Sequence, residues 1–353
     1  MENKILLVDI SISGHRMGYI DAIRKKTKCE CLLPYDKNIE FIYYRMESEF
    51  DQKRNIINYI KFIREINRIV KRDNIEIVHI LCGDAIYKFF GLGLNVISVP
   101  TIITFHHMSF SKLKKVAIKN IFKNIDIGVV HTNYLFFELK KMKIDNIEHI
   151  EYPVFGMKCN NSQEQSRNLL DLPYSKKILT VMGGTQRYKG LDILLEALNY
   201  VNEDFYLFIC GPERDFKKEY INEAIKYYKD RVKLQLRFLD DFEFQNAINA
   251  SDIIILPYRY EFDGASGPLA ESTMYKKEII ASNHGSLGKI VNQYHLGETF
   301  ETENSKSLAL VIEKSFREKF IWDEIAEKYR ISLTVENFQE KYKELYDMIK
   351  GEC

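Results

Sequence analysis

Two acidic residues with a small-residue turn between them form the first group whose spacing suggests chemistry. Asp263 and Glu271 have seven residues between them, and Ser266, Gly267 and Pro268 lie within that interval. Pro is favoured in the first turn of a helix, which predicts a helix start here with Glu271 about one turn inside. Free N–H groups at a helix start can hold a phosphate, and carboxylates accept hydrogen bonds from sugar hydroxyls or a ribose diol. An ordinary capped helix with an exposed acid is the alternative.

A second group follows the apolar run at 177–182. Gly183 and Gly184 open this loop, and two cations, Arg187 and Lys189, stand two residues apart further on. Glycine lets the backbone approach a ligand closely, and the cations supply fixed positive charge, so the combination suits a diphosphate. A solvated loop with ordinary surface cations is the alternative.

Two further candidates follow apolar runs in the first half of the chain. Gly14 comes after the run at 5–10, where a glycine ahead of a helix again favours an anion. His106 and His107 close the run at 101–105. An imidazole there can donate to a hydroxyl or take a proton near neutral pH. The alternatives are an ordinary strand-to-helix turn and a hydrogen-bonded structural histidine.

The apolar runs that precede these candidates alternate with helical segments. The segment at 52–72 has apolar residues at close to helical spacing, which predicts a long amphipathic helix. Strands alternating with helices predict parallel, doubly wound sheets, which bind ligands at the carboxyl ends of their strands. The predicted strands lie at 5–10, 75–81, 101–105, 125–131, 177–182, 205–211, 232–238, 252–258 and 278–282.

The alternation pauses at 154–176, a polar stretch that we interpret as a linker. The predicted fold class is therefore α/β, with two Rossmann-like doubly wound domains facing a cleft. The first domain is predicted at 1–153 and the second at 154–333. A final helix at 334–353 is expected to pack back on the first domain.

Bulk composition limits the class of protein. The chain has 353 residues, 46% hydrophobic and 29% charged, as in a globular protein, and no apolar run long enough to span a bilayer. The net charge of +1 divides into +7 over residues 1–150 and −6 over the rest. Six scattered cysteines and the lack of a secretory signal favour a cytoplasmic protein. An acidic second half argues against nucleic-acid binding.

Taken together, these motifs resemble the GT-B-fold retaining glycosyltransferases, family 4 (glycosyl transferases group 1) in particular. The similarity is strongest from about 178 to 296. The family's paired acids correspond to Asp263 and Glu271, its Arg and Lys-Gly to Arg187 and Lys189, and its T-x-H strand end to His106.

The chain departs from the family pattern in two places. Its first acid is Asp263 where the family has Glu, and Glu261 stands nearby as a rival. Gly184 occupies the usual place of the family's Arg, and Arg187 comes only two residues before Lys189.

The resemblance implies a role for each site residue. Lys189, helped by Arg187 and the N–H groups of Ser266 and Gly267, would stabilise a departing nucleoside diphosphate, and Glu271 would hold its ribose. The base would lie near 238–240. The resemblance also implies that no metal or other cofactor is needed, and that the second domain binds the donor and the first the acceptor. On the sugar side, Asp263 would contact the donor sugar and His106 would lie beside the anomeric centre, while Gly14 and Gly184 belong to loops that approach the donor.

The expected function is therefore retaining transfer of a sugar from a nucleoside-diphosphate sugar to a glycan or lipid-linked acceptor in bacterial cell-surface polysaccharide assembly. A nucleotide-sugar epimerase and a non-catalytic nucleotide-sugar binding protein are the alternatives. The segment 111–124 carries five lysines and no acid, with Val116, Ala117, Ile118, Ile121 and Phe122 on an apolar side. It predicts either docking on an anionic membrane at its inner face or a helix packed on the sheet with its lysines in water.

Overall fold

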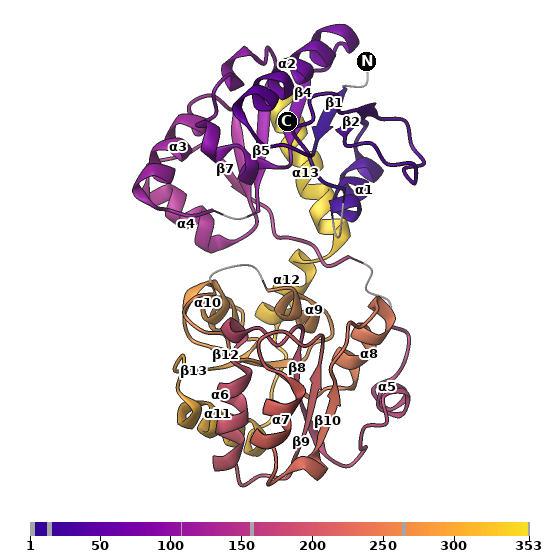
Figure 1. The fold of residues 1–353 in the computed structure, drawn as a ribbon, viewed down its shortest axis with the longest axis vertical. Helices are drawn as coiled ribbons and strands as arrows, with labels where there is room; N and C mark the ends of the chain where they lie inside the picture. Colours follow the sequence, from indigo (N-terminus) through magenta and orange to yellow (C-terminus); the bar gives the residue numbers. More distant parts are fainter. Residues whose placement is uncertain (1–3, 13–15, 107, 156–158, 263–265, 352–353) are drawn as a thin grey trace. The chain divides into compact units, whose positions relative to one another are not determined.

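The computed structural model describes residues 4–12, 16–106, 108–155, 159–262 and 266–351 of the chain. The chain divides into two compact units (Figure 1). Unit 1 comprises Met1–Phe155 together with Val335–Cys353, and unit 2 comprises Gly156–Thr334. Among the described residues, no helix is both long and apolar enough to cross a membrane.

Unit 1 is built on one parallel sheet of seven strands within its described part. The strand order is β3-β2-β1-β4-β5-β6-β7, so β1 lies inside the sheet between β2 and β4. The inner strands are short and almost fully buried, as in other sheets covered on both faces, whereas the two edge strands are partly exposed. The strands are β1 (Ile5–Val8), β2 (Cys29–Leu33), β3 (Tyr44–Arg45), β4 (Ile77–Ile80), β5 (Thr101–Phe105), β6 (Ile127–Val130) and β7 (Ile147–His149).

Helices cover both faces of this sheet, because successive strand residues point to opposite sides. Leu6 and Val8 pack with α2, α3 and α4, whereas Ile5 and Leu7 pack with α1 and α13. The helix α13 comes from the far end of the chain and lies beside α1 (Figure 1). The helices are α1 (Arg16–Lys26), α2 (Ile56–Asp73), α3 (Lys112–Phe122), α4 (Asn133–Lys141) and α13 (Val335–Lys350), with single turns η1 (Gly83–Ala85), η2 (Tyr87–Phe89) and η3 (Leu94–Val96).

The basic helix α3 uses its apolar side for the core of unit 1. Ala117, Ile118, Ile121 and Phe122 are buried, whereas Val116 is exposed along with the helix's lysines. The packing of α3 on the sheet is therefore the arrangement that the structure shows. Placing Val116 on the same side as the buried residues was wrong, since it lies at the edge of that stripe.

Unit 2 repeats the same architecture. Its described strands form one parallel sheet of six, in the order β10-β9-β8-β11-β12-β13. Together with unit 1 this confirms the predicted α/β class with two doubly wound sheets. The strands are β8 (Lys177–Met182), β9 (Phe205–Cys210), β10 (Val232–Gln235), β11 (Ile253–Leu256), β12 (Glu278–Ser282) and β13 (Gly297–Phe300).

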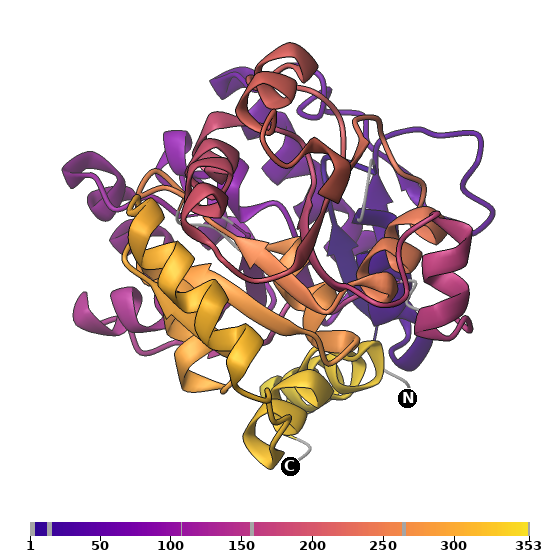
Figure 2. The same ribbon diagram turned by 90° about the horizontal axis from the view of Figure 1, so that it is seen from below.

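Helices again pack on the sheet of unit 2. One face packs with α6, α7 and α11, and α11 lies along that face in Figure 2. The helices α8 and α9 contact β8 and β12. The helices are α5 (Gln163–Leu169), α6 (Leu191–Ala197), α7 (Lys218–Ala224), α8 (Asp241–Ala250), α9 (Gly267–Met274), α10 (Gly285–Gln293), α11 (Ser305–Arg317) and α12 (Glu324–Ser332), with single turns η4 (Arg187–Lys189), η5 (Leu198–Tyr200) and η6 (Lys229–Arg231).

The interpretation of 154–176 as a linker was wrong, because α5 lies within it and packs on α8. Ser162 and Gln165 cap this helix reciprocally, and Arg167 forms a 2.6 Å ion pair with Asp252. The Ser166 hydroxyl donates to the side chain of Asn246 at 2.8 Å. Polar contacts hold α5 in place, so the sequence lacked the apolar periodicity that would have revealed it.

Candidate functional site

The carboxyl ends of β8 and β9 come close together at two glycines of unit 2. Gly183 and Gly211 both have left-handed backbone, with φ of +93° and +129°. The Gly183 N–H donates to the Cys210 carbonyl at 2.9 Å, and a Cβ on Gly211 would collide with the Gly183 carbonyl. Two strands inside the sheet therefore end in bare backbone, at the edge where α/β sheets bind ligands.

Lys189 lies against this backbone. It ends the single turn η4, and a Cβ on Gly183 would collide with its ammonium group. Burial lowers the pKa of Lys189, and no described residue forms an ion pair or a hydrogen bond with the ammonium. A desolvated cation without a carboxylate partner favours an anionic ligand.

Arg187 differs from Lys189 although both belong to η4. Its side chain is exposed and makes no salt bridge with any described residue. Both backbone polar groups of Arg187 are hydrogen-bonded: its N–H donates to Asp215 Oδ2 at 2.8 Å, and its carbonyl accepts from Arg259 Nε at 3.2 Å. Of the two predicted diphosphate cations on this turn, Lys189 is half-buried and Arg187 is exposed to solvent.

The η4 loop docks on the segment that follows β11. Gly190 has φ of +66°, and a Cβ there would collide with the Pro257 carbonyl. The Arg259 N–H donates to the Tyr188 carbonyl at 2.8 Å. These contacts require glycine at position 190 and hold Lys189 beside the connection from β11 to α9.

Tyr258 links the Lys189 loop to the start of α9. Its ring centroid lies 5.9 Å from Lys189 Nζ, and its hydroxyl lies 3.4 Å from Ser266 Oγ. The Ser282 hydroxyl donates to its carbonyl at 2.6 Å. Tyr258 was not among the predicted site residues, because it closes the apolar run at 252–258. Its position directly after a strand and a proline was the signal that could have identified it.

The predicted helix start after 262 is confirmed. Ser266 is the N-cap of α9, its hydroxyl accepts from the Leu269 N–H at 3.3 Å, and Pro268 lies in the first turn. This start places the Gly267 N–H among the free donors of the first turn. Asp263, the predicted sugar-binding acid, lies outside the described residues.

Glu271 lies one turn into α9, and its carboxylate turns back toward the helix start. Its Oε2 lies 3.8 Å from the position that a Cβ on Gly267 would take. Burial raises the pKa of Glu271 to about 7, with a smaller contribution from the charge of Asp241. No described group donates a hydrogen bond to this carboxylate, so ligand hydroxyls are the partners that would stabilise its ionised form.

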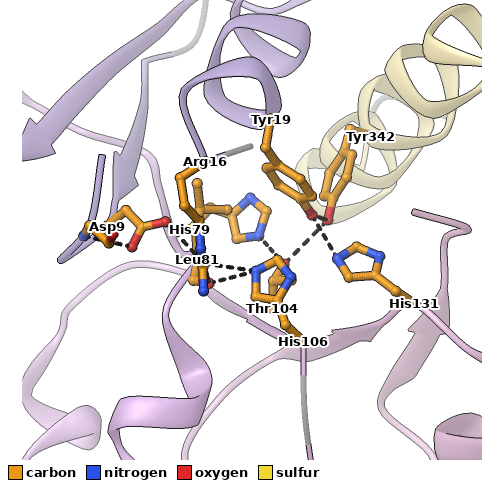
Figure 3. Close-up of polar contacts among 10 residues, drawn as sticks. Asp9, Arg16, Tyr19, His79, Leu81, Thr104, His106, His131 and Tyr342 are labelled. Atoms are coloured by element: carbon orange, nitrogen blue, oxygen red, sulfur yellow. Dashed lines mark hydrogen bonds and ion pairs between the residues drawn. The ribbon is translucent and has the colours of Figure 1, made fainter. Parts of the chain in front are cut away.

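In unit 1, His106 belongs to a polar cluster at the carboxyl ends of β1, β4 and β5 (Figure 3). Arg16 Nη1 lies 3.2 Å from Asp9 Oδ2, 3.1 Å from the Leu81 carbonyl oxygen and 2.9 Å from His106 Nε2. His106 Nε2 also lies 3.1 Å from the Leu81 oxygen. With its proton on Nδ1 the ring accepts from Arg16, and with its proton on Nε2 it donates to Leu81.

Asp9 and Arg16 were not predicted as part of the His106 site. Asp9 is buried, and burial raises its pKa to about 6, although the charge of Arg16 opposes the shift. The sequence places Asp9 directly after the first strand, which was the available signal. Gly14 and His107 lie outside the described residues.

Behind His106, a chain of buried hydrogen bonds runs through unit 1 to α13 (Figure 3). If each group in the chain donates to the next one, every ring nitrogen and hydroxyl has a partner and both histidines are neutral. Burial lowers the pKa of His79 to about 3, in agreement with a neutral ring. The His131 ring, at the end of the chain, lies 5.0 Å from the His106 ring. The chain runs from Tyr346 to His79, Thr104, Tyr342, Tyr19, His131 and the Ile150 carbonyl.

Gly184, the remaining glycine predicted for the site, lies next to the side chain of Gln186. A Cβ on Gly184 would press on the Gln186 side chain, whose Oε1 is buried and has no described partner. Within the described ranges, no three His, Cys, Asp or Glu side chains are grouped closely enough to hold a metal ion.

Two parallel doubly wound units, with a glycine-rich cation loop and a helix start at the strand ends of unit 2, define the GT-B fold of glycosyltransferases. The family model "Glycosyl transferases group 1" matches residues 162–340, just over half of the chain. The chain belongs to this family, which confirms the resemblance seen in the sequence. No match is found among curated proteins.

Solved structures with the same fold cover nearly all of the chain. A glycosyltransferase from Rickettsia africae is 21% identical, with a TM-score of 0.77 and coverage of 99% of this chain and 98% of its own. Alr3699/HepE from Anabaena, solved with UDP-glucose, is 15% identical, with a TM-score of 0.68 and coverage of 98% and 99%. The lipopolysaccharide outer core galactosyltransferase WaaB is 13% identical, with a TM-score of 0.71 and coverage of 99% and 100%.

Proposed function

We propose that this chain is a retaining glycosyltransferase that moves a sugar from a nucleoside-diphosphate sugar to a glycan or lipid-linked acceptor. The observation that carries the proposal is the half-buried Lys189 ammonium, which has no described anionic partner and is linked through Tyr258 to the start of α9. A cation and free amide donors in one place suit the two phosphates of such a donor.

The leaving group is the part of the reaction that unit 2 would serve. As the sugar departs, negative charge grows on the diphosphate oxygens, and preorganised donors there lower the barrier. Lys189 and the N–H groups at Ser266 and Gly267 supply these donors, with Arg187 reaching in from solvent. Glu271 accepts hydrogen bonds from the ribose hydroxyls, and the base lies near 238–240.

The sugar itself is assigned to Asp263 and His106. A carboxylate accepts hydroxyl hydrogen bonds and opposes the positive charge of an oxocarbenium-like sugar. The imidazole of His106, fixed by the Arg16 cluster, donates to or accepts from a sugar hydroxyl. We propose that the reaction retains the anomeric configuration and needs no metal ion, because cationic side chains take the role that Mg²⁺ has in other transferases.

The solved relatives support the kind of donor and pathway. One of them was solved with UDP-glucose, and another is a lipopolysaccharide galactosyltransferase. We propose by analogy a role in bacterial cell-surface polysaccharide assembly in the cytoplasm, at the inner face of the membrane. The lysines of 111–124 and the exposed Leu113 and Val116 would face anionic lipid. Vesicle binding that weakens as salt rises would support this location, and equal recovery in the supernatant at low salt would contradict it.

A nucleotide panel with purified protein tests the proposed function. Melting is measured with UDP, GDP, ADP and CMP, and the nucleotide that stabilises identifies the base. The matching sugar donor is then supplied to wild type and Glu271→Ala, with and without EDTA. We expect nucleotide release by wild type in both buffers and a loss of at least about 100-fold in the variant.

The configuration of the released or transferred sugar, read by NMR, distinguishes retention from inversion. Donor binding without nucleotide release would favour the non-catalytic binding protein. Conversion of the sugar while it stays on the nucleotide would favour the epimerase. An absence of stabilisation by every nucleotide would contradict the proposal altogether.

A further inference from the structure

A pocket of about 420 Å³ in unit 1 lies apart from the residues assigned to the sugar donor. Three connections of the sheet supply its walls: the segment before α2, the turns η1 and η2 after β4, and the first turns of α3 after β5. The side chains that matter for its chemistry are Arg54, Asp84, Tyr87, Lys88, Phe90, Leu113 and Lys114.

The pocket lies on the side of the sheet where ligands bind. In a parallel sheet the connections that leave the carboxyl ends of the strands meet at one edge, and each of these three connections is of that kind. The connection that supplies Leu113 and Lys114 is the one that carries His106. The pocket is therefore on the functional edge of unit 1.

Positive charge dominates this pocket. Arg54, Lys88 and Lys114 line it, against the single carboxylate of Asp84 among its described lining residues. Neither Arg54 nor Lys114 forms a salt bridge with any described residue, and the Lys88 ammonium donates to the backbone carbonyl of Arg54. Three cations that the fold leaves without carboxylate partners suit a phosphate group.

Tyr87 gives a second, independent indication of a ligand. Its side chain is 9% exposed and lines the pocket, and its hydroxyl is buried with no hydrogen-bond partner among the described residues. A buried hydroxyl without a partner costs free energy, which a ligand oxygen in the pocket would recover. Burial raises the pKa of Tyr87, and the charge of Asp84 adds to the shift, so the phenol keeps its proton and can donate it in a hydrogen bond.

The remaining wall is apolar. Phe90 and Ala117 line the pocket together with Leu113, which is 67% exposed although it is a large hydrophobic residue. Val116, exposed on the same helix, extends this apolar surface beyond the pocket. An inorganic anion would use the cations alone and leave this surface in contact with water.

We propose that this pocket binds the acceptor, and that the acceptor carries a phosphate joined to an apolar chain. Arg54 and Lys114 pair with the phosphate, Tyr87 donates to one of its oxygens, and the chain covers Leu113 and Phe90. That the ligand is the acceptor rests on the proposed function, whereas the binding chemistry rests on the pocket alone.

Calorimetric titration of the full-length protein with decyl phosphate, kept below its micelle concentration, tests this proposal. Inorganic phosphate and the uncharged decyl glucoside are the comparison ligands. We expect decyl phosphate to bind at least about tenfold more tightly than either, because only it engages both the cations and the apolar wall. Arg54→Gln combined with Lys114→Gln should weaken its binding at least about tenfold.

Two further variants separate the pocket from general surface charge. Lys115→Gln combined with Lys119→Gln removes the same charge from exposed positions of α3 outside the pocket, and decyl phosphate should bind it within about twofold of wild type. Tyr87→Phe should weaken binding about fivefold without lowering the melting temperature, because the hydroxyl has no partner to lose among the described residues.

Equal losses in the two lysine-containing pairs, or equal affinity for inorganic phosphate and decyl phosphate, would overturn the proposal. Failure of decyl phosphate to bind would overturn it as well. No donor nucleotide takes part in the titration. Binding of decyl phosphate by a protein without transferase activity would therefore contradict the proposed function and the acceptor role, while the binding chemistry of the pocket would stand. Nucleotide release without decyl phosphate binding would contradict only this inference.

Discussion

Replacing Lys189 with Met is expected to stabilise the ligand-free protein while it impairs the reaction. Burial of the ammonium lowers the pKa of Lys189, and no described carboxylate compensates for the lost hydration. Met has a similar length and fills the same space without a charge. An ordinary structural lysine would change stability and activity in the same direction, so opposite signs identify a residue kept for its ligand.

The size of each effect follows from the surroundings of Lys189. Removing a half-buried charge that has no partner among the described residues should raise the free energy of unfolding by about 1 kcal/mol. For a unit of this size that corresponds to about 2–4 °C in melting temperature. The loss of one preorganised donor to the leaving diphosphate should lower kcat by about 100- to 1000-fold.

Thermal unfolding and nucleotide release measured on the same preparations check this prediction. Lys328→Met, at an exposed position of α12, is the control and should leave both quantities near those of wild type. The stabilising nucleotide should also raise the melting temperature of wild type more than that of Lys189→Met. A variant with normal kcat, or one that melts lower than wild type and also releases nucleotide more slowly, would refute the assignment of Lys189 to the diphosphate.

Glu271→Gln should become more stable relative to wild type as pH rises from 5 to 8. The pKa of Glu271 in the folded protein is about 7, above its ordinary value of 4.5, so wild type loses stability across that interval and the variant does not. Melting curves at both pH values test this, and a constant difference would show that the carboxylate is not desolvated. Asp9→Asn should lower kcat/KM about tenfold at pH 8, because the ionised carboxylate of Asp9 holds Arg16 beside His106. It should also remove the fall in kcat/KM below about pH 6, because the folded pKa of Asp9 is about 6. The pH profile of Asp145→Asn, which changes an exposed acid, should match that of wild type, and an unchanged fall in Asp9→Asn would exclude Asp9 as its source.

Much of the architecture could be predicted because its signals are local. Central strands such as 253–256 and 5–8 are unbroken aliphatic runs, and their burial on both faces leaves little choice of residue. The start of α9 could be predicted from Ser266 and Pro268, whose preferences act within one turn. The strands β2 and β13, with the sequences CECLL and GETF, were missed because strands near a sheet edge need not be uniformly apolar.

The parts of the site that could not be predicted depend on contacts between distant residues. Arg16 lies 90 positions from His106, and Tyr342 lies 323 positions from Tyr19. Nothing local to either residue indicates its partner, because the sheet order and the return of α13 bring them together. The same holds for Tyr258, which contacts Lys189 only because Gly190 lets the η4 loop approach the Pro257 carbonyl.

The electrostatics of unit 2 argue that Lys189 and Glu271 are held apart for a ligand. Both groups are desolvated. The Lys189 ammonium lies 5.9 Å from the ring centroid of Tyr258, and burial raises the pKa of Tyr258 to about 12, with a smaller contribution from the charge of Glu271. Neither shifts the pKa of the other, although a direct ion pair would relieve both penalties. A fold selected for stability alone would join them. Because the ammonium and the carboxylate do not pair with each other, each is available to a molecule that carries both phosphates and hydroxyls.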